Sequence, residues 1–133
     1  MLIRKRITII QLGKPARHNL NEELQWFAHS LGLFGERDKD RSCFRLFLEL
    51  LKSVKENKAL SSDELALKTH LSRGTVVHHL NELIKKGIVV TEGKRYALRE
   101  ENLVTLIDDL EKDFEKLFKD LRRSAEVIDR ILE

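Results

Sequence analysis

A short stretch in the second half of the chain combines side chains that could recognise nucleic-acid bases. They are Arg73, Gly74, Val77, His78 and Asn81. In the major groove of DNA, arginine pairs with guanine, asparagine pairs with adenine, and a small apolar group can contact a thymine methyl. This chemistry requires that the five residues lie together on one exposed surface.

A helix over residues 72–86 would place them on such a surface. Apolar residues recur at intervals of three and four, at Val76, Leu80, Leu83 and Ile84, and this spacing predicts one buried stripe. Ser72 is a favourable N-cap, and Lys85 with Lys86 suits the C-terminal end of a helix before Gly87. The candidate recognition residues then lie off the buried stripe, near the start of the helix.

A shorter helix is predicted to precede this one. Ser61 and Glu64 have the S-x-x-E spacing of a capping box. Leu60 and Leu65 are placed as the two partners of a hydrophobic staple. Both patterns start the helix at Ser61.

Beyond Gly87 the pattern changes to two runs rich in β-branched and aromatic residues, at 88–91 and 94–98. The dipeptide Glu92-Gly93 lies between them, which predicts a hairpin with a two-residue turn. Lys94 and Arg95 would make the tip of this hairpin, or wing, basic.

The order of helix, turn, helix and hairpin over residues 61–99 resembles the winged-helix repressors of the ArsR/MarR-like broad class. The resemblance rests on the runs D-E-L-A, L-S, T-V, H-H-L and G-I-V, followed by E-G-K-R-Y-A-L. It implies a dimeric transcriptional regulator whose helix 72–86 lies in the major groove of double-stranded DNA. By position, it implies that the DNA-facing residues are Ser72, Arg73, Gly74, Val77, His78 and Asn81.

The same resemblance assigns roles to the flanking residues. Lys94 and Arg95 would contact DNA from the wing, and Thr75 would support the helix start and a phosphate. We also expect Lys85, at the other end of the helix, to contact a phosphate. His79 would support structure. In one respect the chain departs from the pattern, because His70 stands where such turns commonly carry glycine in a left-handed conformation. We therefore expect a turn of slightly different shape.

The remaining residues extend this head at both ends, and we predict a mainly α fold with a small β-hairpin wing. Residues 1–36 would form an accessory strand and helix, residues 37–99 the winged helix-turn-helix head, and residues 100–133 a long C-terminal dimerisation helix. The helix behind the reading head would run over 40–56, capped by Asp38 or Asp40, and it is apolar nearly all round.

At the N-terminus, isoleucines alternate unevenly over residues 2–12, and this pattern predicts a strand. The run Arg4, Lys5 and Arg6 could instead form a disordered arm that enters a minor groove. A helix over 21–31 follows, with Asn19 or Asn21 as its cap.

Residues 101–132 carry an apolar heptad seam. Its members are Leu103, Ile107, Leu110, Phe114, Leu117, Leu121, Ile128 and Ile131, with Ser124 as the only polar occupant. A helix of this length spans roughly 45 Å, which is more than a small head can cover. We therefore predict a homodimer formed through this helix, and the alternative is that the helix folds back on its own core.

Composition narrows the class of function. The net charge of the 133 residues is +3, but residues 1–60 hold 12 Lys/Arg against 7 Asp/Glu, whereas residues 100–133 hold 6 against 11. Such an asymmetry would orient the protein on a polyanion. Cys43 is the only cysteine, and no signal peptide or membrane-length apolar stretch is evident. We expect a cytoplasmic protein with no membrane partner.

No pattern predicts a catalytic, metal or cofactor site. The adjacent His78 and His79 would point about 100° apart on a helix, so they cannot readily chelate one ion. Phosphate-binding loops and nucleophile motifs are absent from the sequence. We therefore expect that this protein is not an enzyme. The sequence does not indicate whether a small-molecule effector binds. The alternative function is a winged-helix protein-protein interaction or assembly module, because fold alone does not fix function.

Overall fold

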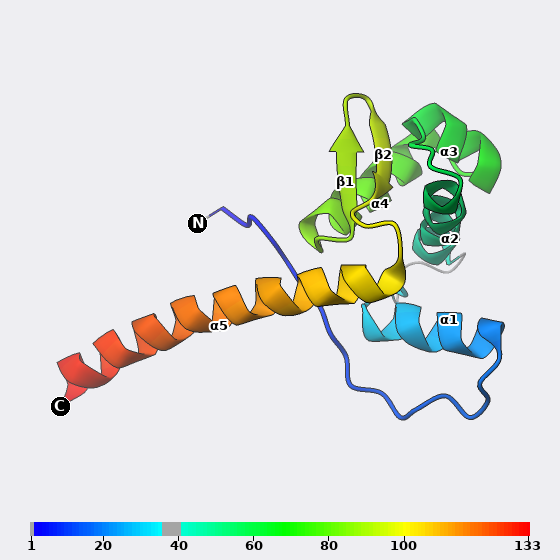
Figure 1. The fold of residues 1–133 in the computed structure, drawn as a ribbon. Coiled ribbons are helices and arrows are strands. Elements are labelled where there is room, and N and C mark those ends of the chain that lie inside the picture. The colour runs from blue at the N-terminus through cyan, green and yellow to red at the C-terminus, as the bar shows by residue number, and fades with distance from the viewer. Residues whose placement is uncertain (1, 36–40) are drawn as a thin grey trace.

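Helices and one hairpin follow one another along residues 2–35 and 41–133, which the computed structural model describes (Figure 1). The elements are α1 (Leu20–Ser30), α2 (Ser42–Lys55), α3 (Ser62–Thr69), α4 (Arg73–Lys85), β1 (Val89–Glu92), β2 (Arg95–Leu98) and α5 (Leu103–Leu132). This order confirms the predicted mainly α fold with a small hairpin and a long last helix. The predicted boundary at residue 37 and the predicted caps Asp38 and Asp40 lie outside the described residues.

The start of α3 is held by the predicted capping box. The Ser61 hydroxyl accepts a hydrogen bond from the Glu64 amide at 3.1 Å, and the Glu64 carboxylate accepts one from the Ser61 amide at 3.3 Å. Leu60 and Leu65, the predicted staple, are both buried. Two of the unpaired amides at this helix end are therefore satisfied by side chains.

The turn between α3 and α4 passes through a left-handed residue. His70 caps α3 with φ 57° and ψ 33°, so it adopts the left-handed conformation that glycine usually supplies. A residue with a Cβ adopts this conformation at a cost of about 1–2 kcal/mol. His70 therefore holds a strained backbone conformation at the end of α3.

The strain at His70 should affect the free energy of unfolding. We expect His70→Gly to raise the free energy of unfolding by up to about 1 kcal/mol, because glycine removes the left-handed penalty. Lys68→Gly, inside α3, is the matched control and should lower it by about 1 kcal/mol. Urea unfolding monitored by circular dichroism measures both. Destabilisation by both variants would show that His70 makes a compensating contact.

The wing differs from the predicted hairpin by one residue. Glu92 pairs with Arg95, so the two turn residues are Gly93 and Lys94 rather than Glu92 and Gly93. Gly93 has φ 65°, whereas Lys94 does not have a positive φ; glycine at the first turn position alone is the pattern of a type II′ turn. Leu60 adds a short third pairing, because its amide and carbonyl both bond to Tyr96.

The core of the head is built around α2. Its residues Phe44, Leu46, Phe47 and Leu50 are buried. Side chains from the other elements pack in the same cluster, among them Leu65 of α3, Val76, Leu80 and Leu83 of α4, and Ile88, Val89 and Leu98 of the wing. Each such side chain contributes about 1.5–3 kcal/mol through burial. The buried stripe of α4 is the predicted one, and it fixes which face of α4 is exposed.

The helix α5 packs on the head only over its first part. Asn102 caps it by accepting a hydrogen bond from the Thr105 amide at 2.8 Å, and Leu106 and Leu110 are buried. Leu110, predicted on the dimer seam, therefore belongs to the chain's own core. The later turns of the helix extend away from the head in Figure 1.

The predicted strand over residues 2–12 is wrong. No strand is formed there; the segment is extended and bonds to helix ends instead, from the Arg6 amide to the Lys85 carbonyl and from the Ile10 amide to the Ser30 carbonyl, each at 2.8 Å. The last carbonyls of a helix have no partner within the helix. The segment satisfies two of them, and this explains why it lies against α4 and α1 without a neighbouring strand.

Candidate nucleic-acid interface

The exposed face of α4 collects the predicted recognition residues. Gly74, His78, Asn81 and Lys85 are exposed and follow one another at intervals of four, three and four residues, so they form one line along the helix. Arg73 is exposed at the start of the same face, and Val77 is half-buried beside it. We call these six residues the α4 face. It presents donors, acceptors and small groups to solvent.

The N-terminal end of α4 is ordered by two side chains. The Ser72 hydroxyl accepts a hydrogen bond from the Thr75 amide at 3.1 Å and donates one to the Thr75 hydroxyl at 2.8 Å. Thr75 thus supports the helix start, as the resemblance implied. The other amides of the first turn and the positive end of the helix dipole are suited to a phosphate group.

Arg73 is held only loosely. Its Nε lies 3.5 Å from Asp63 Oδ1, and both side chains are 72% exposed. An ion pair so exposed is worth little and exchanges readily with other partners. The guanidinium is therefore available to a ligand that reaches the α4 face.

His79 lies on another side of α4 and has a structural contact. Its Nε2 is 2.7 Å from the Ser42 hydroxyl at the start of α2. This placement agrees with the supporting role that the resemblance implied for His79. The neighbouring His78 is exposed on the α4 face, and its ring centroid lies 5.5 Å from that of His79 with the two rings tilted.

The two basic residues of the wing have different surroundings. Lys94 is an exposed turn residue. Arg95 Nη1 donates to the Glu64 carboxylate at 2.5 Å and to the Ala59 carbonyl at 3.2 Å. The Ser61 amide, with further help from Arg95, lowers the pKa of Glu64 below its usual value. Arg95 thus ties the wing to the start of α3, a role that sequence reasoning missed.

A second ionic cluster fixes α5 to the head. The Asp113 carboxylate accepts hydrogen bonds from Arg99 at 2.7 Å and from Lys5 at 2.8 Å, and Arg99 also lies 3.4 Å from Asp109. Arg99, followed by Lys5, lowers the pKa of Asp113. Sequence reasoning missed this cluster; the only pattern that could have indicated it is the opposite charge of residues 4–6 and the acidic α5.

The ion pairs of Asp113 should make the stability of the protein depend on pH. Because the folded-state pKa of Asp113 is lowered, its ion pairs stabilise the protein above the ordinary Asp pKa of about 3.9, and this contribution is lost as the pH falls below that value. We expect Asp113→Asn to lower the Tm at pH 7 and to flatten the loss of Tm between pH 5 and pH 3, a window set by roughly that pKa. Thermal unfolding across this range measures it. An unchanged slope would remove Asp113 from the acid response.

Lys85 and Lys86 end α4 in different environments. Lys85 is exposed and lies 3.8 Å from Glu82. Lys86 donates to the Thr8 hydroxyl at 3.2 Å, and burial lowers its pKa. Of the two, Lys85 belongs to the exposed face and Lys86 to the contact with the N-terminal segment.

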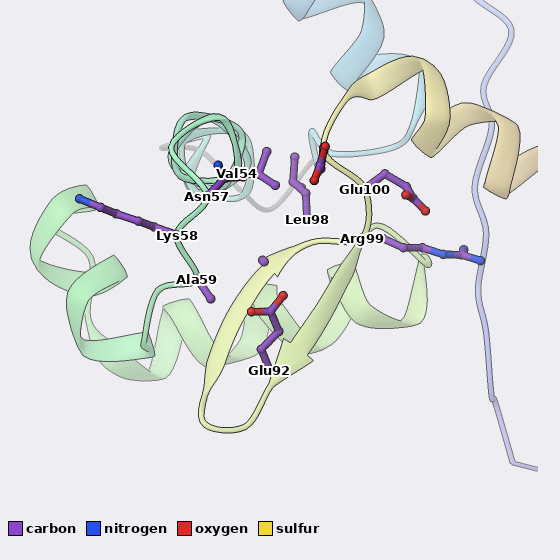
Figure 2. A pocket seen from close by; sticks show the side chains of 10 residues that line it. Val54, Asn57, Lys58, Ala59, Glu92, Leu98, Arg99 and Glu100 are labelled. Carbon is purple, nitrogen blue, oxygen red and sulfur yellow. The ribbon is translucent and has the colours of Figure 1, made fainter.

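A cavity of about 350 Å³ lies between the end of α2, the wing and the start of α5. Figure 2 shows its lining, and the cations Lys58 and Arg99 point away from the space at its centre. Arg99 is already bound to Asp113. The cavity therefore has no converging set of cations for an anionic ligand.

Two further features, a metal site and a membrane-spanning helix, are not found in the described residues. Residues 2–35 and 41–133 contain no group of three or more His, Cys, Asp or Glu side chains placed to hold a metal ion. Among the helices described, none is both long and apolar enough to cross a membrane.

One comparison with known proteins finds a similarity in the central part of the chain. A family model described as winged helix-turn-helix DNA-binding matches residues 48–90, which run from within α2 through α3 and α4 into β1. The match covers the α4 face and does not single out the ArsR/MarR-like class. Searches of the curated proteins and of the solved structures found no match.

Proposed function

We propose that this chain, which carries a winged helix-turn-helix DNA-binding domain at residues 48–90, is a transcription regulator that binds specific sequences of double-stranded DNA as a homodimer. The observation that carries the proposal is the α4 face, an exposed line of residues on the helix that this family of domains uses to bind DNA. No exposed large apolar side chain lies on this face, because Val77 is half-buried.

Base recognition is assigned to three side chains of the α4 face. Arg73 can donate two hydrogen bonds to a guanine, and Asn81 can pair with an adenine. His78, one turn further along than Gly74, reaches the same groove edge. Gly74 has no neighbouring atom within 4 Å of the place where a Cβ would stand, so the backbone can approach the DNA closely.

Phosphate contacts are assigned to the ends of this face. The first turn of α4, with Ser72 and Thr75, suits one phosphate, and Lys85 at the other end suits a second. Lys94 at the wing tip is free to reach a third. Arg95 is held by Glu64, and its contribution is to fix the position of the wing.

Lys94 gives a prediction that separates affinity from specificity. We expect Lys94→Ala to weaken binding to every duplex alike and to reduce the salt slope of log K by about 1, because one phosphate contact is lost. Lys52→Ala, at an exposed position of α2, is the control and should change neither. Fluorescence anisotropy at several salt concentrations measures the slope. A loss confined to one sequence would make Lys94 a base contact.

Dimerisation is assigned to the part of α5 beyond the head. Its apolar residues from Leu117 onward are not covered by the chain itself. A helix-turn-helix dimer binds two half-sites related by two-fold symmetry. A homodimer would therefore supply a use for this surface and a second reading helix.

The competing function, a protein-protein interaction or assembly module, finds less support on the head. Protein interfaces depend on clustered large side chains, aromatic ones above all. Within residues 42–99 the exposed large apolar side chains are Leu67 and Val90, on α3 and β1. They do not form a cluster with the α4 face.

Selection from a library of random duplexes tests the proposal. We expect enrichment of one pseudo-palindromic DNA sequence whose two half-sites share the same base preferences. Footprinting should show that α4 contacts both half-sites. The variant Asn81→Ala should relax preference at one position of each half-site. Absence of any enriched sequence, with the protein folded and dimeric, would favour the interaction module.

A further inference from the structure

The second half of α5 exposes a continuous apolar surface. Leu121 is 63% exposed and Ile128 51% exposed, and Leu117, Phe118, Ile131 and Leu132 are exposed on the same half. Exposed apolar surface gathered in this way marks an interaction site in soluble proteins. In Figure 1 no other element lies beside this part of the helix.

The first half of α5 borders two apolar pockets. One of about 240 Å³ is lined by Ile9, Leu31, Ile107, Leu110, Glu111 and Phe114. The other, of about 280 Å³, is lined by Phe27, Leu103, Val104, Ile107 and Asp108. Ile107 lines both, so the two pockets adjoin along α5, bordered by α1 and the N-terminal segment. We call this pair of adjoining pockets the α5 groove.

Charge is distributed unequally along the same helix. Residues 108–115 hold five carboxylates and one lysine, whereas residues 116–123 hold four cations and one carboxylate. Asp109 and Asp113 are already bound by Arg99 and Lys5. The three remaining carboxylates still leave the first block negative, and the second block is positive.

We propose that the α5 groove of each copy binds the second half of α5 from another copy of this chain, with the two helices antiparallel. This inference rests on the homodimer of the proposed function and adds its geometry. A two-fold axis near residues 115 and 116 places the negative block of each helix against the positive block of the other. A parallel pair would instead place like charges together, which is destabilising.

The spacing of the apolar residues fits the same register. Leu110 and Leu103 line the two pockets and are seven residues apart, as are Leu121 and Ile128. In the antiparallel pair Leu121 of the second copy lies at Leu110, and Ile128 of the second copy lies at Leu103. Seven helical residues rise roughly 10 Å, so both side chains enter the groove together. Ile107 meets Ser124, the one polar residue of the seam.

The arrangement has a consequence for the heads. The head of each copy lies beside the C-terminal end of the other copy's α5, so the two α4 faces are carried at opposite ends of the helix pair. Each copy contributes the same groove and the same second half of α5, so the two halves of the interface are identical, as two-fold symmetry requires.

Inter-copy distances test the orientation. Spin labels are attached to Lys116→Cys or to Arg130→Cys, each in a Cys43→Ala background with wild-type circular dichroism. We expect a distance below about 25 Å at position 116, which lies near the axis, and about 45 Å or more at position 130, from the helical rise. Short distances at both positions would show a parallel dimer and overturn the inference while leaving the homodimer. Monomers in sedimentation, with no inter-copy distance, would overturn both.

Charge reversal supplies a second test with surface residues alone. The variant Arg122→Glu with Arg123→Glu should raise the dimer dissociation constant at least tenfold at low salt. Adding Asp108→Lys and Glu111→Lys in the same chain should restore it, because the two blocks then exchange sign. Failure of this restoration, with dimerisation lost, would contradict the antiparallel register.

Discussion

Replacement of Arg73 by alanine is expected to weaken binding to the selected DNA sequence by roughly 5- to 150-fold, about 1–3 kcal/mol, and to leave binding to scrambled DNA nearly unchanged. The reason is that a bidentate contact to guanine is lost while the phosphate contacts are kept. Among residues 2–35 and 41–133, the ion-pair partner of Arg73 is Asp63 at 3.5 Å, a weak and exposed contact, so its removal should not disturb the fold. Anisotropy titrations on both duplexes measure the two affinities.

The matched control for this experiment is Asp63→Ala. It frees Arg73 from its partner and removes a negative charge near the α4 face, so it should leave affinity for the selected sequence unchanged or raise it. Equal weakening of Arg73→Ala on all duplexes would reassign Arg73 to a phosphate. Full retention of specificity would exclude Arg73 from base recognition.

The second large effect is expected from the exposed half of α5. The variant Leu121→Ser with Ile128→Ser should convert the dimer into a folded monomer and lower DNA affinity about 100-fold or more. Two linked reading heads gain affinity from the second contact being intramolecular, by about 10²–10⁴-fold. Both side chains are more than half exposed, so their loss costs the monomer little. Sedimentation and DNA titration measure the two effects.

The control for this variant lies on another face of the same helix. Glu126→Ser with Glu133→Ser makes the same number of changes at the same spacing, at exposed positions outside both charged blocks and without touching the apolar surface, and it should stay dimeric. A dimer that survives Leu121→Ser with Ile128→Ser would show that the second half of α5 is not the interface.

The head could be predicted from the sequence because its patterns are local and repeated. The capping box of Ser61 and Glu64 and the cap at Ser72 place helix starts within a few residues of themselves. The period of Val76, Leu80 and Leu83 then decides which face is buried and, by difference, which face is exposed. For this reason the α4 face was predicted almost complete.

The hairpin turn was misplaced because Gly93 fits either position of a two-residue turn. Placed second, it predicts a turn at Glu92-Gly93; the structure places it first, with Lys94 after it. The choice between them depends on the pairing of the strands, which Leu60 and Tyr96 help to fix. That information lies outside the turn itself.

The N-terminal segment was misread for a similar reason. Its isoleucines alternate as in a strand, but a strand exists only where another strand pairs with it. Here the carbonyls at the ends of α4 and α1 are the available partners. The contact of Lys5 with Asp113 joins residues 108 positions apart, and no local pattern indicates such a pair.

The role of Arg95 also depended on distant residues. Its position beside the wing tip predicts a DNA contact, whereas Glu64 and Ala59 hold it against the start of α3. Charge and position alone do not reveal whether a cation is already paired. The same holds for Leu110, whose heptad position suits a dimer seam and whose side chain is buried in the chain's own core.

In the proposed function, this protein reads DNA sequence through α4. The decisive experiment is binding of the purified protein to the DNA upstream of its own gene and to scrambled DNA, titrated at low and moderate salt. We expect tighter binding to the upstream DNA and a steep salt dependence, with the preference lost in Arg73→Ala. Equal binding to both duplexes at every salt concentration, unchanged in Arg73→Ala, would contradict it.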